Sequence, residues 1–362
     1  MKEITTIINA FNASKPKKLK FALATVVKIQ GSSYRRMGAR MLVCEDGNWV
    51  GGISGGCLEG DALRRALKAI HMQHPSIVTY DTSVDDDHQV GVGLGCKGVI
   101  DVLFQPIESQ DPYHPIALLA SLQDIREPQV VLTMIQGDWS SAIKFGTTLL
   151  LSDIQDTDLS TTIEAPVENA LARGKSSVAV VKNNEGHEVQ LFIEVIKPAL
   201  RLFILGGNYD IYPLIRIGRE LGWHIYVQAK IKQLHQDAFD LSQCIYDLHD
   251  DITDIDGFST VILMSHDLKT DKNNLKKYMH SSTPYIGMLG PRDRSERILN
   301  ELENEEYVIP EDLSDRLYFP VGLDIGAINP EEIAIAICAE IIAHFSGRDG
   351  RSLKYRQGKI YP

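Results

Sequence analysis

The pattern of apolar and polar residues changes at Arg201, and the pattern that follows constrains the fold more than any other feature. Short apolar segments alternate there with amphipathic ones, and the expected strands are "RLFILGG", "WHIYVQA", "CIYDL", "STVILMS" and "PYIGMLG". Helices are expected to begin near Tyr209, Leu268 and Arg292, with a last helix after Pro330. Such alternation indicates a parallel sheet with helices on both faces. Residues 199–346 are therefore predicted to form a Rossmann-like, doubly wound domain, followed by a polar arm over residues 347–362.

Residues 1–198 have the composition of a strand-rich α+β domain. The segments "ARMLVCE" and "NWVGGIS" flank Asp46-Gly47, which is typical of a β-hairpin. The segment "CLEGDALRRALKAIH" has apolar residues at helical spacing, and the strand "GVIDVLFQP" follows it after a polar loop. The strands "QVVLTMIQ" and "SSVAVVKN" are expected to complete the same sheet. The whole chain is thus predicted to be an α/β protein of two domains.

Length and charge limit the classes of function. A chain of 362 residues can hold two domains that each bury a core. Its net charge of -11 argues against binding to nucleic acid or to an anionic membrane surface. The apolar helix "EEIAIAICAEIIAHF" is too short to span a bilayer, and the first residues do not resemble a secretory signal. Five cysteines without a C-x-x-C pair suit a reducing compartment, so we expect a cytoplasmic protein.

The segment "GSSYRRMGAR" follows an apolar strand and combines a glycine-serine turn with three arginines. Backbone N–H groups and guanidinium groups are the usual means of binding phosphate or another oxyanion. The candidate binding residues are Gly31, Ser32, Ser33, Arg35, Arg36 and Arg40. The alternative is a solvated turn with surface arginines.

The segment "ISGGCLEG" places a cysteine where a strand runs into a helix. If the helix begins near Cys57, its N-terminal N–H groups and dipole stabilise a thiolate there. Gly55 and Gly56 would let a ligand approach the backbone, and Glu59 is placed for a polar contact. The alternative is a tight corner that buries the cysteine.

A third stretch, "DTSVDDDHQVGVGLGCKG", is acidic at its start and rich in glycine at its end. Its aspartates and His88 lack the spacing of a calcium loop, so a solvated loop is the favoured interpretation of that part. Gly95 and Cys96 belong to a run of small residues that cannot pack a core. We expect this run to line a concave site.

These three stretches, together with "YIGMLG" and "PVGLDIGAINPEEIAIAICAEIIA", make the chain resemble the xanthine dehydrogenase accessory factor family, XdhC/CoxI. The resemblance implies a homodimeric chaperone that binds molybdopterin, the organic part of the molybdenum cofactor. It further implies two partners, a cysteine desulfurase that supports sulfuration of the cofactor and a xanthine dehydrogenase-type molybdoenzyme that receives it. Under this resemblance the arginine loop would hold the phosphate of molybdopterin. Cys57 would face the metal as a soft ligand with Cys96 as the second sulfur, and whether they bind molybdenum, relay sulfur or shape the pocket stays open.

The Rossmann-like half departs from the pattern of a dinucleotide site. Gly206 and Gly207 follow its first strand as candidate cofactor contacts, but Asn208 and Ile211 stand where the fingerprint has its other glycines. No acidic residue follows the second strand, so NAD binding is not expected. These positions also differ from the accessory family.

Three further residues of this half are candidates for a ligand site. His266 and Asp267 follow a strand at the carboxyl edge, where such sheets bind ligands, although Asp267 is also a candidate helix N-cap. Asp324 lies between glycines in a loop that, with "GMLGPRDR", could close over the same cleft. The favoured function is therefore a non-catalytic cofactor-insertion chaperone with its site between the domains. The alternatives are an NAD(P)-dependent oxidoreductase and a dimeric scaffold.

Overall fold

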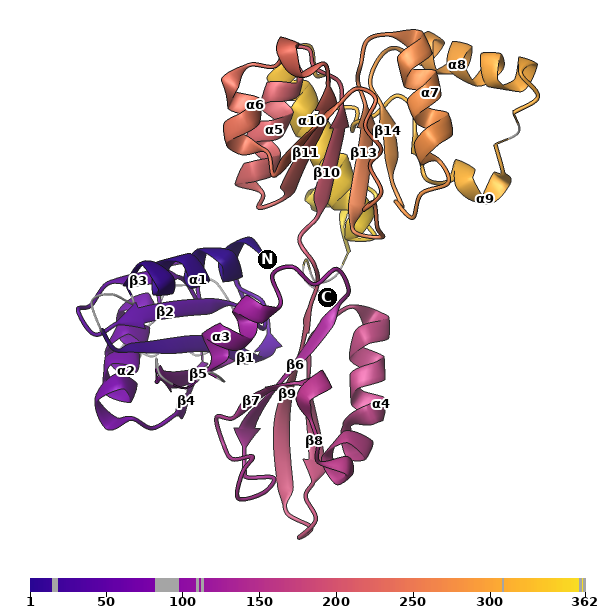
Figure 1. Ribbon diagram of the computed structural model, residues 1–362. Coiled ribbons are helices and arrows are strands. Elements are labelled where there is room, and N and C mark those ends of the chain that lie inside the picture. Colours follow the sequence, from indigo (N-terminus) through magenta and orange to yellow (C-terminus); the bar gives the residue numbers. More distant parts are fainter. Residues whose placement is uncertain are drawn as a thin grey trace. The chain divides into compact units, whose positions relative to one another are not determined.

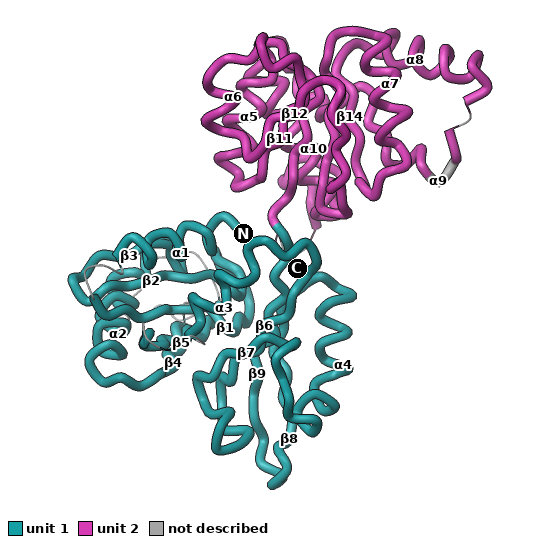
Figure 2. The backbone as a smooth tube through the Cα atoms, viewed as in Figure 1, with its two compact units in different colours: residues 1–198, 361–362 teal, residues 199–360 magenta. Residues whose placement is uncertain are grey.

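A computed structural model describes residues 1–14, 19–81, 98–108, 111, 114–307, 309–357 and 360. The chain divides into two compact units, which are coloured separately in Figure 2. Unit 1 contains Met1–Pro198 and unit 2 contains Ala199–Ile360. Each unit is described by itself below.

Unit 1 begins with a five-stranded antiparallel sheet of strand order β3-β2-β1-β5-β4. Its elements are α1 (Lys2–Ser14), β1 (Phe21–Gly31), β2 (Arg40–Cys44), β3 (Trp49–Gly51), α2 (Glu59–Met72), β4 (Ser76–Asp81) and β5 (Gly98–Ile107). The predicted hairpin is confirmed, because β2 and β3 pair around Gly47, whose φ is +87°.

Alternation along β1 explains why helices lie on both faces of this sheet. Ala22, Ala24 and Val26 are buried with the apolar residues of α2. Phe21 and Leu23 point to the other face and are buried with α1. Successive side chains of a strand point to opposite faces, so a continuous apolar run is buried only when both faces are covered.

The second half of unit 1 forms a separate sheet, which corrects the expectation of a single one. Its elements are α3 (Pro115–Ser121), β6 (Gln129–Gln136), β7 (Thr148–Leu150), α4 (Thr157–Arg173), β8 (Ser177–Lys182) and β9 (Glu188–Ile196). The strand order is β7-β6-β9-β8, again antiparallel. Leu159, Ile163 and Val167 of α4 cover one face of this sheet. Because α4 supplies a core of its own, the two sheets need not share strands.

Unit 2 is a six-stranded parallel sheet of order β12-β11-β10-β13-β14-β15 (Figure 1). Its strands are β10 (Arg201–Leu205), β11 (His224–Ala229), β12 (Cys244–Asp247), β13 (Ser259–Leu263), β14 (Ile286–Met288) and β15 (Leu317–Tyr318). The order reverses between β10 and β13, as in Rossmann folds. The predicted fold class is confirmed.

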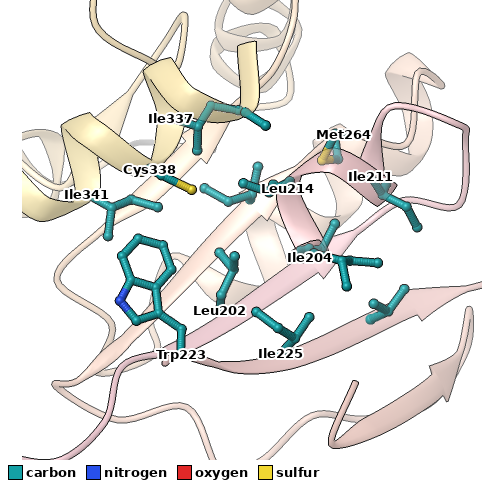
Figure 3. Packing of buried hydrophobic residues seen from close by; sticks show 14 of the residues in the cluster. Leu202, Ile204, Ile211, Leu214, Trp223, Ile225, Met264, Ile337, Cys338 and Ile341 are labelled. Carbon is teal, nitrogen blue, oxygen red and sulfur yellow. The ribbon is translucent and has the colours of Figure 1, made fainter. Parts of the chain in front are cut away.

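Helices cover both faces of the parallel sheet. Its helices are α5 (Ile211–Glu220), α6 (Gln236–Leu241), α7 (Leu268–Tyr278), α8 (Arg292–Asn304), α9 (Glu311–Ser314) and α10 (Pro330–Phe345). Figure 3 shows α10 and α5 packing on one face through Ile337, Cys338, Leu214 and Ile211. The helices α7 and α8 cover the other face. No helix in the described part of the chain is long and apolar enough to cross a membrane.

Candidate functional site

The glycine-rich stretches of unit 1 meet at one end of its five-stranded sheet. Gly31 at the end of β1 pairs with Gly98 at the start of β5. A Cβ atom at Gly98 would lie 2.1 Å from the carbonyl oxygen of Ser32, so only glycine fits there. A Cβ atom at Gly55 would lie 3.3 Å from the ring of Tyr34. The turn after β1 therefore lies against both the start of β5 and the glycine turn before α2.

Ser54 and Glu59 hold the glycine turn in place. The Ser54 hydroxyl oxygen accepts hydrogen bonds from the backbone N–H groups of Gly56, Cys57 and Leu58 at 3.2, 3.1 and 3.1 Å. The Glu59 carboxylate accepts from the Ser54 backbone N–H at 2.8 Å and from the Ser54 hydroxyl at 2.5 Å. Burial of the carboxylate opposes ionisation, but these bonds outweigh it and hold the pKa of Glu59 below its usual value. Glu59 thus anchors the turn.

The helix after this turn begins later than the sequence predicted. Helix α2 starts at Glu59, with Leu58 at its N-cap and no side-chain cap. Cys57 thus lies just before α2, because Ser54 binds the N–H groups of residues 56–58, which form a turn of their own. These three groups already have a partner, so they do not remain free for an anion.

Cys57 nevertheless lies on the surface. Of the four cysteines that the structure describes, it alone is exposed, whereas Cys44 and Cys338 are buried. Burial raises the pKa of the Cys44 thiol and raises that of Cys338 to about 12. The neighbouring Gly56 has a φ of +114°, and among the described residues, its chain neighbours aside, no atom lies within 4 Å of where a Cβ would be.

Two arginines of the predicted anion loop are held by carboxylates of the protein. Arg40 is buried and forms an ion pair with Glu194 of β9, and its guanidinium also donates to the carbonyl oxygen of Gly38 at 2.7 Å. Arg35 forms an ion pair with Glu3 of α1. The charge of Arg40 is therefore compensated inside unit 1, and the predicted ligand contact of this residue stays a prediction. Gly31, Ser32 and Arg36 are exposed, and Ser33 is half-buried.

Gly95 and Cys96, the remaining candidates of the third stretch, lie outside the described residues, as do the aspartates at 85–87 and His88.

In unit 2, packing explains the two glycines that follow β10. A Cβ atom at Gly206 would lie 2.3 Å from the carbonyl oxygen of Met264, and one at Gly207 would lie 2.9 Å from the Cβ of Ala229. The chain therefore passes too close to its neighbours to carry side chains there. Asp210 follows as the residue before helix α5.

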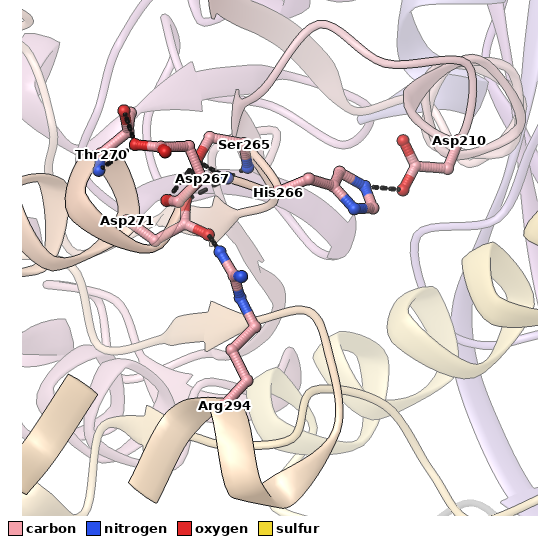
Figure 4. A network of polar contacts seen from close by, with 7 residues as sticks. All are labelled: Asp210, Ser265, His266, Asp267, Thr270, Asp271 and Arg294. Atoms are coloured by element: carbon pink, nitrogen blue, oxygen red, sulfur yellow. Dashed lines mark hydrogen bonds and ion pairs between the residues drawn. The ribbon is translucent and has the colours of Figure 1, made fainter. Parts of the chain in front are cut away.

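His266 and Asp267, the two candidate residues that follow β13, make different contacts. Asp267 is the N-cap of α7 and accepts a hydrogen bond from the Thr270 backbone N–H at 2.7 Å. The hydroxyl and backbone bonds from Thr270 hold the pKa of Asp267 below its usual value. The alternative interpretation of Asp267 as a cap therefore describes what it does. His266 instead points to Asp210, with 2.6 Å between its Nε2 and the carboxylate Oδ2 (Figure 4).

His266 also lines a pocket of about 150 Å³ in unit 2. The lining residues are Met264, His266, Leu289, Gly290, Pro291 and Arg294. Asp324 is exposed and does not line this pocket, so the structure brings the "GMLGPRDR" segment to His266 but not the loop around Asp324. Sequence reasoning missed Asp210 and Asp271; an aspartate directly before a helix, as Asp210 is, is a recognisable signal, whereas Asp271 lies inside α7.

Among the residues that the structure describes, no three His, Cys, Asp or Glu side chains group in a way that could hold a metal ion.

Two family models match the chain and together span more than half of it. One is described as the XdhC Rossmann domain and matches residues 202–341, and the other is described as the XdhC and CoxI family and matches residues 17–81.

Two curated proteins are similar over most of their length. A Bacillus subtilis protein, named as a probable xanthine dehydrogenase subunit, is 28% identical over 335 residues, covering 88% of this chain and 92% of that protein. An Escherichia coli protein named molybdenum cofactor insertion chaperone PaoD is 23% identical over 321 residues, covering 88% and 81%. A crystal structure described as a xanthine dehydrogenase from Bacillus halodurans matches with a TM-score of 0.71 at 25% identity, covering 97% of this chain and 98% of that one.

Proposed function

The chain belongs to the XdhC and CoxI family, and from this membership we propose that it carries the molybdenum cofactor and inserts it into a xanthine dehydrogenase-type enzyme. The observation that carries the proposal is its similarity, over 88% of its residues, to a protein named molybdenum cofactor insertion chaperone. The name of the Bacillus subtilis relative refers to xanthine dehydrogenase itself. An accessory protein that serves this enzyme without catalysing its reaction fits both names.

The cofactor is cargo in this proposal, and the turn of residues 54–59 is its binding site. Cys57 supplies an exposed sulfur next to open space at Gly56, and thiolates are the soft ligands that suit a sulfur-bound metal. Tyr34 is 68% exposed and its ring lies on Gly55, so it presents a flat surface at the same turn as Cys57. Such a surface suits a planar heterocycle.

In this proposal the turn of Gly31, Ser32 and Ser33 binds the phosphate of molybdopterin, because Arg35 and Arg40 are engaged by carboxylates. Backbone N–H groups of a glycine-serine turn can bind an oxyanion without a guanidinium. We further propose a cysteine desulfurase as the partner that supports sulfuration of the bound cofactor, and a homodimer as the working form.

The alternative, an NAD(P)-dependent oxidoreductase, has less support. Asp210 stands directly before helix α5, where a dinucleotide pyrophosphate would approach the helix in a Rossmann fold. A buried carboxylate at that position repels a phosphate.

Activation of a cofactor-free xanthine dehydrogenase tests the proposed function. The full chain, loaded with molybdenum cofactor, is mixed with the apoenzyme and xanthine oxidation is followed. We expect activation by wild type and by Cys244→Ser, whose thiol is half-buried in β12, and a loss of about tenfold or more with Cys57→Ser. Equal activation by Cys57→Ser contradicts the assignment of this cysteine, and no activation by any form contradicts the function.

A further inference from the structure

The pocket of unit 2 is lined by residues that follow β13 and β14, beside the point where the strand order of its sheet reverses. Strands β10 and β13 are neighbours, and the chain leaves them toward opposite sides of the sheet. Asp210 comes from the segment after β10 and His266 from the segment after β13. Their side chains meet across this switch point (Figure 4). Ligands of open α/β sheets bind in this position.

His266 is held in an unusual conformation. Its φ is +60°, in the left-handed region that few residues other than glycine adopt. The flanking residues fix this conformation, because Ser265 donates to Asp271 at 2.6 Å and Asp267 caps α7. The imidazole is still 51% exposed. Strained residues of this kind concentrate at functional sites, and His266 both lines the pocket and contacts Asp210.

Asp210 determines which nitrogen of the ring carries the proton. Its carboxylate is only 9% exposed, and Oδ2 lies 2.6 Å from His266 Nε2. A carboxylate can only accept, so Nε2 carries the hydrogen in the neutral ring and Nδ1 keeps its lone pair. The other carboxylate oxygen, Oδ1, is buried and has no hydrogen-bond partner in the described part of the chain. Asp210 is therefore a positioning residue that leaves Nδ1 as a proton acceptor.

The opposite wall of the pocket is suited to negative charge. Fully buried Asp271 accepts from Nη2 of Arg294 at 2.7 Å and compensates its charge, so Arg294 would bind an anion through its other guanidinium N–H groups. Gly290 and Pro291 lead into the N-terminus of α8, a helix of 13 residues without a side-chain cap. The backbone N–H of Arg294 is bonded to the Pro291 carbonyl oxygen at 3.0 Å, and the dipole of such a terminus favours an anion beside the guanidinium. Asp210 does not line the pocket, so its charge lies behind the imidazole.

We propose that this pocket binds a small molecule through a carboxylate or phosphate group, and that His266 accepts a proton from that molecule. In this step an O–H or N–H bond of the ligand breaks, its electron pair stays on the ligand, and an N–H bond forms at Nδ1. Asp210 compensates the imidazolium, and Arg294 faces the negative charge on the ligand. The volume of about 150 Å³ suits a molecule roughly the size of benzene. The proposal is independent of the proposed cofactor chaperone function.

The test follows the imidazole directly in the full chain. Histidines are labelled with 15N, and inorganic phosphate or glycolate is added at neutral pH. In the neutral ring of His266 we expect the hydrogen on Nε2 and not on Nδ1. We expect phosphate, glycolate or both to bind with a Kd on the order of 1 mM. On binding, the 15N chemical shift of Nδ1 should change toward the value of a protonated nitrogen. The anion that binds more tightly identifies the acidic group of the ligand.

Variants of Arg294 test anion binding, and a variant of Asp210 tests whether it positions the proton of His266. Arg294→Gln should weaken anion binding by about tenfold, and Arg294→Lys, which keeps a cation beside buried Asp271, should weaken it less. Asp210→Asn should shift the His266 proton toward Nδ1, which a merely structural role would not do. Asp237→Asn is the matched control, because Asp237 pairs with the exposed His235 outside the pocket.

Three results would overturn the proposal. The first is a His266 signal that neither anion changes at about 50 mM, and the second is equal binding by wild type and both Arg294 variants. The third is an unchanged proton position on His266 in a folded Asp210→Asn protein.

Discussion

Replacing Arg40 by glutamine should destabilise unit 1 without removing a ligand contact. The side chains of Arg40 and Glu194 are only 5% and 7% exposed, so the variant leaves a carboxylate buried without its ion partner. Removing one member of a buried pair costs about 3–5 kcal/mol of unfolding free energy. For a unit of this size each kcal/mol lowers the Tm by about 2–4 °C, so we expect a fall of about 6–20 °C.

Thermal unfolding measures the fall, and hydrogen exchange of the β2 and β9 peptides locates it. Arg35→Gln is the matched control, since the Arg35–Glu3 pair is about one third exposed and should contribute no more than about 1 kcal/mol. The double variant Arg40→Met with Glu194→Leu should regain most of the loss, because two apolar groups leave no unpaired charge. An Arg40→Gln protein with the Tm of wild type and weaker molybdopterin binding would refute this reasoning.

Three further predictions follow from the described contacts. Glu59→Gln should lower the free energy of unfolding at pH 7 by about 1 kcal/mol, measured from urea unfolding curves. Because the pKa of Glu59 is depressed in the folded state, this difference between wild type and variant should vanish as the pH falls below about 4. Gly206→Ala should lower the free energy of unfolding by about 2 kcal/mol or more in the same assay, since its methyl group would lie 2.3 Å from the Met264 carbonyl oxygen. An unchanged urea midpoint would show that the backbone moves to accommodate the methyl group. NADH should give no binding heat in calorimetry, whereas micromolar affinity would restore the oxidoreductase alternative.

Local patterns predicted the fold of unit 2 because its strands and helices are regular. The apolar segments between Arg201 and Leu289 became strands, and Asn329 and Pro330 start α10 as cap and first residue. The division of unit 1 into two sheets was not predicted. Helix α4, which makes the second core, contains Pro166 in its interior and therefore does not have the composition of a helix.

The candidate site was predicted in part, and its tertiary partners were missed. The sequence placed Cys57 at an exposed glycine turn and His266 at the carboxyl edge of the sheet, as the structure has them. It could not show that Arg40 pairs with Glu194, because the two residues are 154 positions apart and no local periodicity connects them. Asp210 was missed for the same reason, since its contact with His266 exists only once β10 and β13 are neighbours.

The central claim is that the Cys57 thiol and the glycine turn around it bind the molybdenum cofactor. Native mass spectrometry of the full chain, purified after incubation with the cofactor, counts the bound molecules directly. We expect wild type and Cys244→Ser to retain the cofactor, and Cys57→Ser to retain about tenfold less of it. Retention of the cofactor by Cys57→Ser at the level of wild type would contradict the claim.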